Sequence, residues 1–148
     1  MLWSHRCLKQ YYEEGRILED WKIKISVLWL FYDVAFLVDM VLGFMEPGAI
    51  EQIMAGEIGG TQIGPEFLLL FAVILLAPLV MAFLSLTLKG SINRWANIIL
   101  SIVFTSLMVI ALIELLAQPT AYSILLTLSK VVAGALIVWY AWKSKQKT

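Results

Sequence analysis

The stretch EFLLLFAVILLAPLVMAFLSLTL, residues 66–88, decides the fold. After Glu66 it contains no charged side chain before the chain reaches Lys89, and most of its residues are strongly apolar. A helix needs roughly 20 apolar residues to cross a bilayer core about 30 Å thick. The stretch therefore predicts a transmembrane helix, with lipid as the solvent around it.

Three other stretches are also long and apolar enough to cross a bilayer. The expected spans are residues 23–45, 66–88, 92–117 and 121–142, with an outer loop over 46–65. The turns Lys89-Gly90 and Gln118-Pro119 are very short, so the second and third spans, and the third and fourth, are expected to be antiparallel neighbours. The predicted fold class is an all-α membrane protein, an antiparallel bundle of four transmembrane helices.

Composition agrees with this prediction and excludes several classes. Hydrophobic residues make up 61% of the chain and charged residues 15%, against about 45–50% and about 25% in soluble domains. The net charge of zero gives no electrostatic argument for a nucleic-acid partner. A single cysteine and a single histidine exclude an internal disulfide and a Cys/His zinc site within one chain. No metal and no cofactor are expected.

The lysines and arginines predict the orientation. Ten of the eleven lie on one side of a four-span topology: Arg6, Lys9, Arg16, Lys22, Lys24, Lys89, Arg94, Lys143, Lys145 and Lys147. The opposite loops, 46–65 and 117–120, contain none, and the longer one carries Glu46, Glu51 and Glu57. By the positive-inside rule both termini are expected in the cytoplasm, with the protein in the cell membrane.

The segments outside the spans are expected to lie at the membrane surface. Residues 1–20 form a cytoplasmic segment in which Leu8, Tyr11 and Leu18 recur at helical spacing, which predicts an amphipathic surface helix. Residues 143–148 form a basic cytoplasmic tail. Within the outer loop, residues 47–55 could form a short helix that ends at Gly56. The glycine-rich stretch 56–64 is interpreted as a surface connector, with a re-entrant loop as the alternative.

Three charged residues fall well inside the spans, where each costs roughly 2.5–3.5 kcal/mol at the helix centre. Asp33 and Lys130 lie near the middle of the first and fourth spans, and Asp39 lies about 9 Å further out than Asp33. Side chains lean toward the N-terminus of their helix, so Lys130 should lean outward. This favours Asp39 as its partner, with Asp33 as the competitor. The two aspartates are about 120° apart, so one should face another helix or subunit.

Further polar residues form stripes that can hydrogen-bond across helices. In the third span they are Asn93, Asn97, Ser101 and Thr105, and in the fourth they are Ser123, Thr127, Lys130 and Gly134. Tyr32 shares a stripe with Asp39, and Glu114 is near the outer end of the third span. Pro78 is expected to kink the second span and to free a carbonyl near Ile74.

Four strings of the chain resemble a known family. They are EDWKIKISVLWLFYDVAFLVDMVLGFMEP from Glu19, GGTQIGPEFLLL from Gly59, NRWANI from Asn93 and WYAWK from Trp139. The chain after about residue 17 is similar to an uncharacterised family of small four-helix prokaryotic integral membrane proteins, a domain of unknown function. The resemblance implies four spans and a bacterial or archaeal source. It implies no activity and no site residues.

Two functional hypotheses compete for the polar set. In the first, the protein is a small module that assembles with itself or with another membrane protein, and its Asp/Lys core fixes helix order and register. In the second, it is a channel or transporter subunit that passes an ion, a proton or a small solute by means of Asp33, Asp39 and Lys130. An enzyme is not expected, because the spans contain no histidine cluster, CxxC pair or nucleophile elbow.

Overall fold

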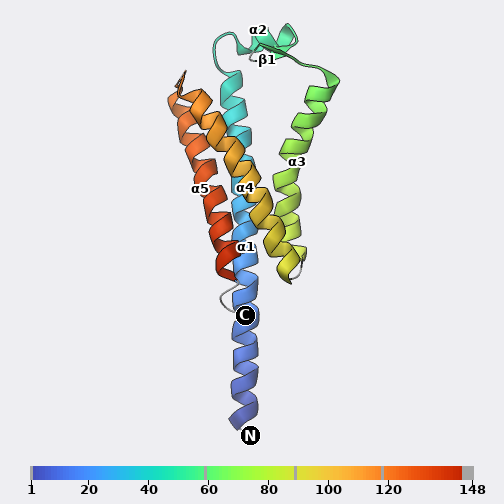
Figure 1. The fold of residues 1–148 in the computed structure, drawn as a ribbon, viewed down its shortest axis with the longest axis vertical. Coiled ribbons are helices and arrows are strands. Elements are labelled where there is room, and N and C mark those ends of the chain that lie inside the picture. Colours follow the sequence, from blue (N-terminus) through green and yellow to red (C-terminus); the bar gives the residue numbers. More distant parts are fainter. Residues whose placement is uncertain (1, 59, 89, 118, 145–148) are drawn as a thin grey trace.

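A computed structural model describes residues 2–58, 60–88, 90–117 and 119–144, with side chains from residue 20 onward. Five helices and a small hairpin follow one another along the chain (Figure 1). They are α1 (Leu2–Phe44), α2 (Ala49–Met54), β1 (Glu57–Ile58), β2 (Thr61–Gln62), α3 (Pro65–Thr87), α4 (Gly90–Leu115) and α5 (Ala121–Lys143).

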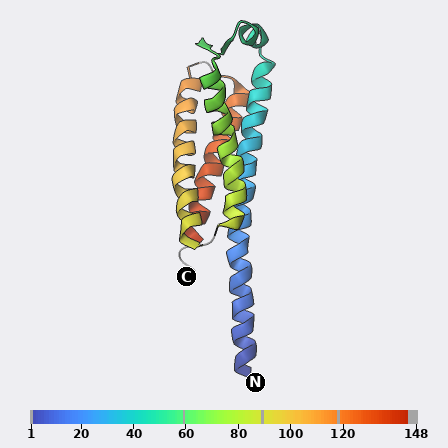
Figure 2. The same cartoon turned by 90° about the vertical axis from the view of Figure 1, so that its right-hand side faces the viewer.

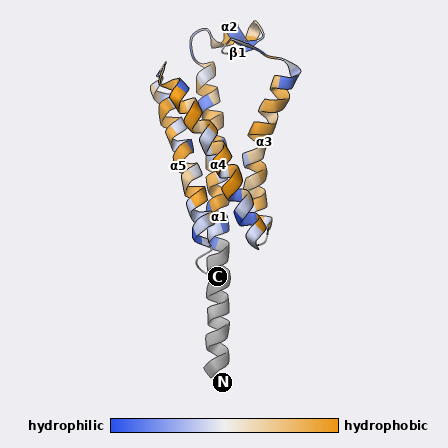
Figure 3. Cartoon of the chain, in the orientation of Figure 1, coloured by the Kyte–Doolittle hydropathy of each residue, from blue (hydrophilic) through white to orange (hydrophobic). Residues whose placement is uncertain are grey.

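Four of the helices are long and apolar enough to cross a membrane. They are the part of α1 over Asp20–Phe44, and the whole of α3, α4 and α5. These bounds agree with the predicted spans to within a few residues. Apolar residues cover the middle of the bundle, whereas polar residues gather toward its two ends (Figure 3). The sequence thus correctly predicts an all-α bundle with four candidate membrane spans.

The first helix differs from the expectation in one respect. The segment expected as a separate surface helix is helical, but α1 runs from Leu2 to Phe44 without an end near residue 20. Continuous helical hydrogen bonding explains this, because no proline interrupts these residues. The amphipathic face expected over residues 2–18 lies outside the described side chains. The proposed domain boundaries and the surface location stay predictions.

The four long helices form a bundle in which α4 runs obliquely, from beside α3 at one end to beside α5 at the other (Figure 1). Figure 2 shows α1 and α4 on opposite sides, with α3 and α5 between them, and Figure 1 shows α3 and α5 on the other two sides. Helix α1 packs against both α3 and α5, and α4 packs mainly against α5. The end that holds α2 and the hairpin is called the hairpin end below. The opposite end, where α5 finishes, is called the tail end.

The expected pairing of the second and third spans is only partly right. Helices α4 and α5 are antiparallel neighbours along their length, but α3 and α4 pack weakly against each other. They meet at the tail end and diverge toward the hairpin end (Figure 1). A short turn fixes the distance between helices only where it joins them, and α3 instead follows α1.

The core lies between the four long helices, where side chains of α1 and α4 meet. Trp29 and Tyr32 of α1 and Phe104 of α4 form an edge-on aromatic cluster with ring centroids 5.9–6.1 Å apart. All three side chains are buried, at 8% exposed or less. Small residues of α5, namely Ala133 and Ala141, are buried against the same core. Large rings thus fill the centre while small side chains allow α5 to approach closely.

The outer loop is more ordered than a simple connector. The short helix expected over 47–55 is present as α2, and Gly56 follows it with φ +79°, in the left-handed region that ends helices. Strands β1 and β2 then pair antiparallel, with Ile58 opposite Thr61. The hairpin, which the sequence did not predict, lies beyond the end of α3 (Figure 1). This position agrees with the surface interpretation rather than with the re-entrant alternative.

Candidate functional site

The charged centre of the bundle joins α1 to α5. The Lys130 ammonium donates to Asp39 Oδ2 at 2.8 Å, and the Ser123 hydroxyl donates to Asp39 Oδ1 at 2.9 Å. Both carboxylate oxygens of Asp39 therefore have a donor. The Lys130 side chain is 3% exposed and that of Asp39 is 20% exposed. The pairing that the sequence favoured is the one in the structure.

The directions of the two helices explain why these residues meet. Helix α5 begins at the hairpin end, so Lys130 leans toward that end and toward Asp39. The stem of Lys130 is buried, and its ammonium lies 5.0 Å from the ring centroid of Phe36, which adds a cation–π contact. Tyr32, expected on the Asp39 stripe, is buried in the core instead of joining the pair, and its hydroxyl faces the Phe104 carbonyl oxygen at 3.4 Å.

A cavity of about 420 Å³ opens at the hairpin end next to this pair. Its lining includes Glu46, Tyr122 and Ser123. The Tyr122 hydroxyl donates to Glu46 Oε1 at 2.7 Å, which ties the end of α1 to the start of α5. Since Ser123 both lines the cavity and donates to Asp39, the charged centre adjoins a polar opening rather than lying in a wholly apolar interior.

The polar stripe of α4 continues toward the tail end. Asn97 is fully buried, and its side-chain oxygen accepts the indole N–H of Trp29 at 2.7 Å. Its amide donates to the backbone and side-chain oxygens of Asn93 at 2.8 and 2.7 Å. The amide of Asn93 in turn donates to the carbonyls of Ser85 and Leu88. This chain of hydrogen bonds joins α1, α4 and the end of α3.

The middle of the stripe is where α4 comes closest to α5. The Ser101 hydroxyl donates to the Gly134 carbonyl at 2.9 Å. A Cβ built on Gly134 would clash with the Thr105 hydroxyl, so a larger residue there would require Thr105 or the helices to move. Thr127 is buried at 4% exposed, on the same face as Lys130. Both predicted stripes thus face the interior of the bundle.

Asp33 lies apart from these networks. Its Oδ1 atom is buried, and no hydrogen-bond partner meets it among the residues that the structure describes. The same holds for Thr105 Oγ1 and Trp21 Nε1. The structure thus places one of the two intramembrane aspartates with the lysine and leaves the other facing elsewhere, as their separation of about 120° around the helix requires.

The remaining predicted residues have smaller roles. Glu114 is exposed near the end of α4. Pro78 is buried within α3, which continues as one helix through it, so the expected kink stays a prediction. Among the described residues, no cluster of three or more His, Cys, Asp or Glu side chains could hold a metal ion. Trp29 belongs to the polar network but was not predicted from the sequence, because a tryptophan within a span is counted as an apolar residue.

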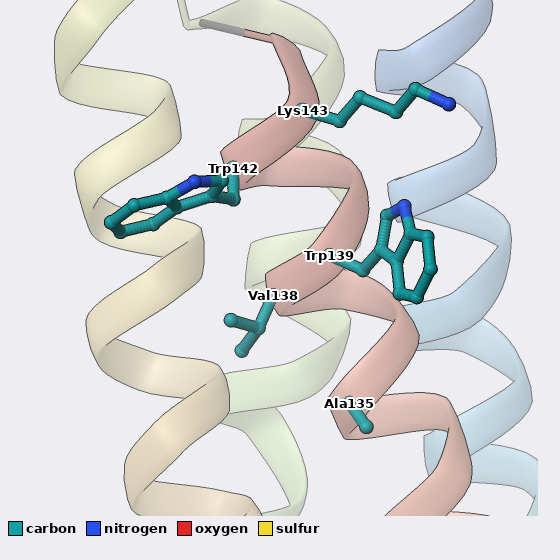
Figure 4. Close-up of a pocket in the computed structure, with 5 residues that line it drawn as sticks. All are labelled: Ala135, Val138, Trp139, Trp142 and Lys143. Atoms are coloured by element: carbon teal, nitrogen blue, oxygen red, sulfur yellow. The ribbon is translucent and has the colours of Figure 1, made fainter.

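A second cavity, of about 470 Å³, lies near the tail end on the outside of α5. Its residues include Val138 and Lys143, with the rings of Trp139 and Trp142 on either side of the helix (Figure 4). Both rings are at least 60% exposed. Such rings favour the level of the lipid headgroups, and their exposure describes an open surface rather than an enclosed binding site.

The chain matches a family model over most of its length. A family model with the description "Family of unknown function (DUF6326)" matches residues 16–148. No curated protein matches the chain, and no solved structure does.

Proposed function

The chain belongs to this family of unknown function, and from its side-chain geometry we propose that it is a small multipass membrane module that assembles with itself or with another membrane protein. In this proposal the Asp39–Lys130 pair serves assembly, because it fixes the order and register of α1 and α5. The observation that carries the proposal is the pairing of Asp39, whose two oxygens accept from Lys130 and Ser123. Because each oxygen already has a donor within the chain, the centre suits a structural latch better than a path for ions.

Two helices offer surface for a partner. In the most apolar window of α3 and of α4, 17% of the residues are buried inside the chain, compared with 28% for α1 and α5. Because α3 diverges from α4, the uncovered surfaces of these two helices are left to lipid or to another protein. A four-helix chain has little interior of its own, so any conducting role would also require several copies.

We propose that the tail end lies in the cytoplasm of a prokaryotic cell. Among the described side chains, Lys22, Lys24, Arg94 and Lys143 are at this end, and the acidic residues Glu46, Glu51 and Glu57 are at the hairpin end. This distribution agrees with the positive-inside rule.

A channel or transporter subunit remains the second candidate. The observation in its favour is the cavity beside Ser123, which brings a polar opening to the charged pair. In this alternative Asp39 and Lys130 would exchange partners with a passing ion or proton.

Reconstitution into liposomes distinguishes the two candidates. The assembly proposal predicts that the wild-type protein and the variants Lys130→Met and Asp39→Asn all show the ion and proton leak of protein-free vesicles, while both variants melt at lower temperature. Oligomeric state in detergent, measured by light scattering, should exceed one copy or shift when a partner is added. A wild-type flux that both variants abolish would overturn the assembly proposal in favour of conduction.

A further inference from the structure

Two contacts fix the register between α1 and α3 near the middle of the bundle. The Ser26 hydroxyl donates to the Ala82 carbonyl at 2.8 Å, and the rings of Phe36 and Phe71 are 6.0 Å apart. The helices are antiparallel, and Asp33 lies between these contacts, seven residues after Ser26 and three before Phe36. On α3, Leu75 lies seven residues before Ala82, and Ile74 lies three residues after Phe71. Asp33 is therefore at the level of residues 74–75.

This level is the one where α3 has a broken hydrogen-bond ladder. Pro78 has no N–H, so the carbonyl of Ile74 lacks the donor that would satisfy it within the helix. Pro78 is buried on the face of α3 that includes Met81 and Ala82. Ile74 packs against the same core. The gap that Pro78 leaves in the ladder therefore lies on the buried side of α3, the side on which Ala82 meets Ser26 of α1.

Asp33 also has a side-chain oxygen that lacks a hydrogen-bond partner within the described part of the chain. Its Oδ1 is buried and has no partner among the described residues. Side chains lean toward the N-terminus of their helix, which for Asp33 is toward the tail end. On α3, Pro78 lies closer to the tail end than Ile74 does. The Asp33 carboxyl therefore leans toward the missing hydrogen bond between Ile74 and Pro78.

Among the residues that the structure describes, no cation forms an ion pair with Asp33. Along α3 the only titratable residue is Glu66, in its first turn. On α5, Lys130 is bound to Asp39 and rests on Phe36, and Phe36 also contacts Phe71 of α3. The other titratable residues of α4 and α5 lie near the ends of those helices: Arg94, Glu114, Tyr122, Tyr140 and Lys143.

Tyr32, the neighbour of Asp33 on α1, is also committed elsewhere. Its hydroxyl faces the Phe104 carbonyl of α4. A carboxylate and a carbonyl are both acceptors, so they repel each other unless a hydrogen or a cation lies between them. A hard metal cation takes six or more oxygen ligands, whereas the register supplies one side chain and one carbonyl. A proton needs only these two.

We propose that Asp33 is a proton-binding site within the bundle, and that the neutral carboxyl group donates its O–H to the free carbonyl of Ile74. The proton comes from water and returns to it, and no other bond changes. The site is separate from the Asp39–Lys130 pair and does not depend on the assembly proposed above. It would give the protein a protonatable group on the helix pair α1–α3, distinct from the latch on α1–α5.

Infrared spectroscopy of the full chain in lipid nanodiscs tests this proposal, because a protonated carboxyl group has a C=O stretch apart from the carboxylate bands. We expect such a band at neutral pH in the wild-type protein, with a shift on transfer to D₂O. The band should be lost in Asp33→Asn and kept in the matched variant Asp39→Asn. Pro78→Ala, which returns a donor to the Ile74 carbonyl, should move the band to the frequency of a more weakly bonded acid.

Three results would overturn it. One is a wild-type spectrum at neutral pH without a protonated carboxyl band. Another is a band that persists in Asp33→Asn and disappears in another carboxyl variant. The third is an Asp33→Asn protein that loses its helical circular dichroism, because a neutral amide should replace a neutral acid without unfolding the bundle. Loss of assembly in the experiment of the previous section would leave the band unaffected, so the two proposals fail separately.

Discussion

Gly134 lies directly against Thr105, so closely that a Cβ at position 134 would overlap the threonine hydroxyl. The same glycine accepts a hydrogen bond from Ser101 through its carbonyl at 2.9 Å. The contact between α4 and α5 thus depends on the missing side chain of one residue. A glycine in the middle of a helix is otherwise unfavourable, so its presence here indicates close packing.

Gly134→Ala should destabilise the bundle although alanine is the better helix former. Overpacking a tight contact costs about 1–3 kcal/mol, of which the gain in helix propensity offsets roughly 1 kcal/mol. Thermal unfolding in detergent, followed by circular dichroism, measures the change. Gly43→Ala is the matched control, because its new Cβ would lie 4.0 Å from the Tyr122 hydroxyl, an ordinary contact. Gly43→Ala should gain stability from helix propensity alone, so a Gly134→Ala variant as stable as Gly43→Ala would contradict this packing.

The effects on stability of substituting Asp39 and Lys130 should be strongly coupled. Lys130→Met leaves the carboxylate of Asp39 without its cation, and breaking one partner of a buried pair costs about 3–5 kcal/mol. Asp39→Asn leaves Lys130 unbalanced and should cost a similar amount. The double variant, which removes both charges, should recover much of this loss. A double-mutant cycle from denaturant unfolding checks the prediction, and additive single effects would contradict it.

The Trp29–Asn97 hydrogen bond should hold α1 to α4. Asn97→Leu leaves the buried indole N–H unpaired, at a cost of about 1–3 kcal/mol. Because membrane helices retain alternative partners when they separate, a value near the lower limit is expected. Ser106→Ala is the control, since that exposed hydroxyl only bonds the Ile102 carbonyl of its own helix. Tryptophan fluorescence should shift in Asn97→Leu and stay unchanged in the control.

The proposed orientation can be tested by chemical labelling. In a Cys7→Ser background, Glu57→Cys places a thiol at the hairpin end and Ser144→Cys places one at the tail end. A maleimide that does not cross membranes should label the first variant in intact cells. It should label the second only after the cells are opened. The reverse pattern, or labelling of both variants in intact cells, would exclude cytoplasmic termini.

Much of the fold could be predicted because hydropathy and helix geometry act locally. The four spans follow from runs of apolar residues, and the Lys130–Asp39 pairing follows from the lean of side chains in opposite helix directions. The side-by-side packing of α3 and α4 was only partly predicted, because Lys89-Gly90 constrains only one end of each helix. What determines the position of α3 is its contact with α1, and contacts between distant segments are not visible in one helix alone.

The candidate site was predictable to a smaller extent. The stripe from Asn93 to Ser101 indicates which face of α4 is buried, since polar residues in a span turn inward. It does not indicate that Asn97 bonds Trp29, because that partner depends on how α1 crosses α4. Likewise, the hairpin of Ile58 and Thr61 depends on two short strands, too short for a pattern of alternating residues to be recognised.

The separation of Asp39 from its partners along the chain has a consequence for biosynthesis. Ser123 and Lys130 follow Asp39 by 84 and 91 residues, and they belong to α5, which leaves the ribosome well after α1. Until α5 arrives, Asp39 lacks its partner Lys130. Insertion of α5 therefore completes the charged pair, and a nascent chain arrested before it should be a substrate for quality-control proteases.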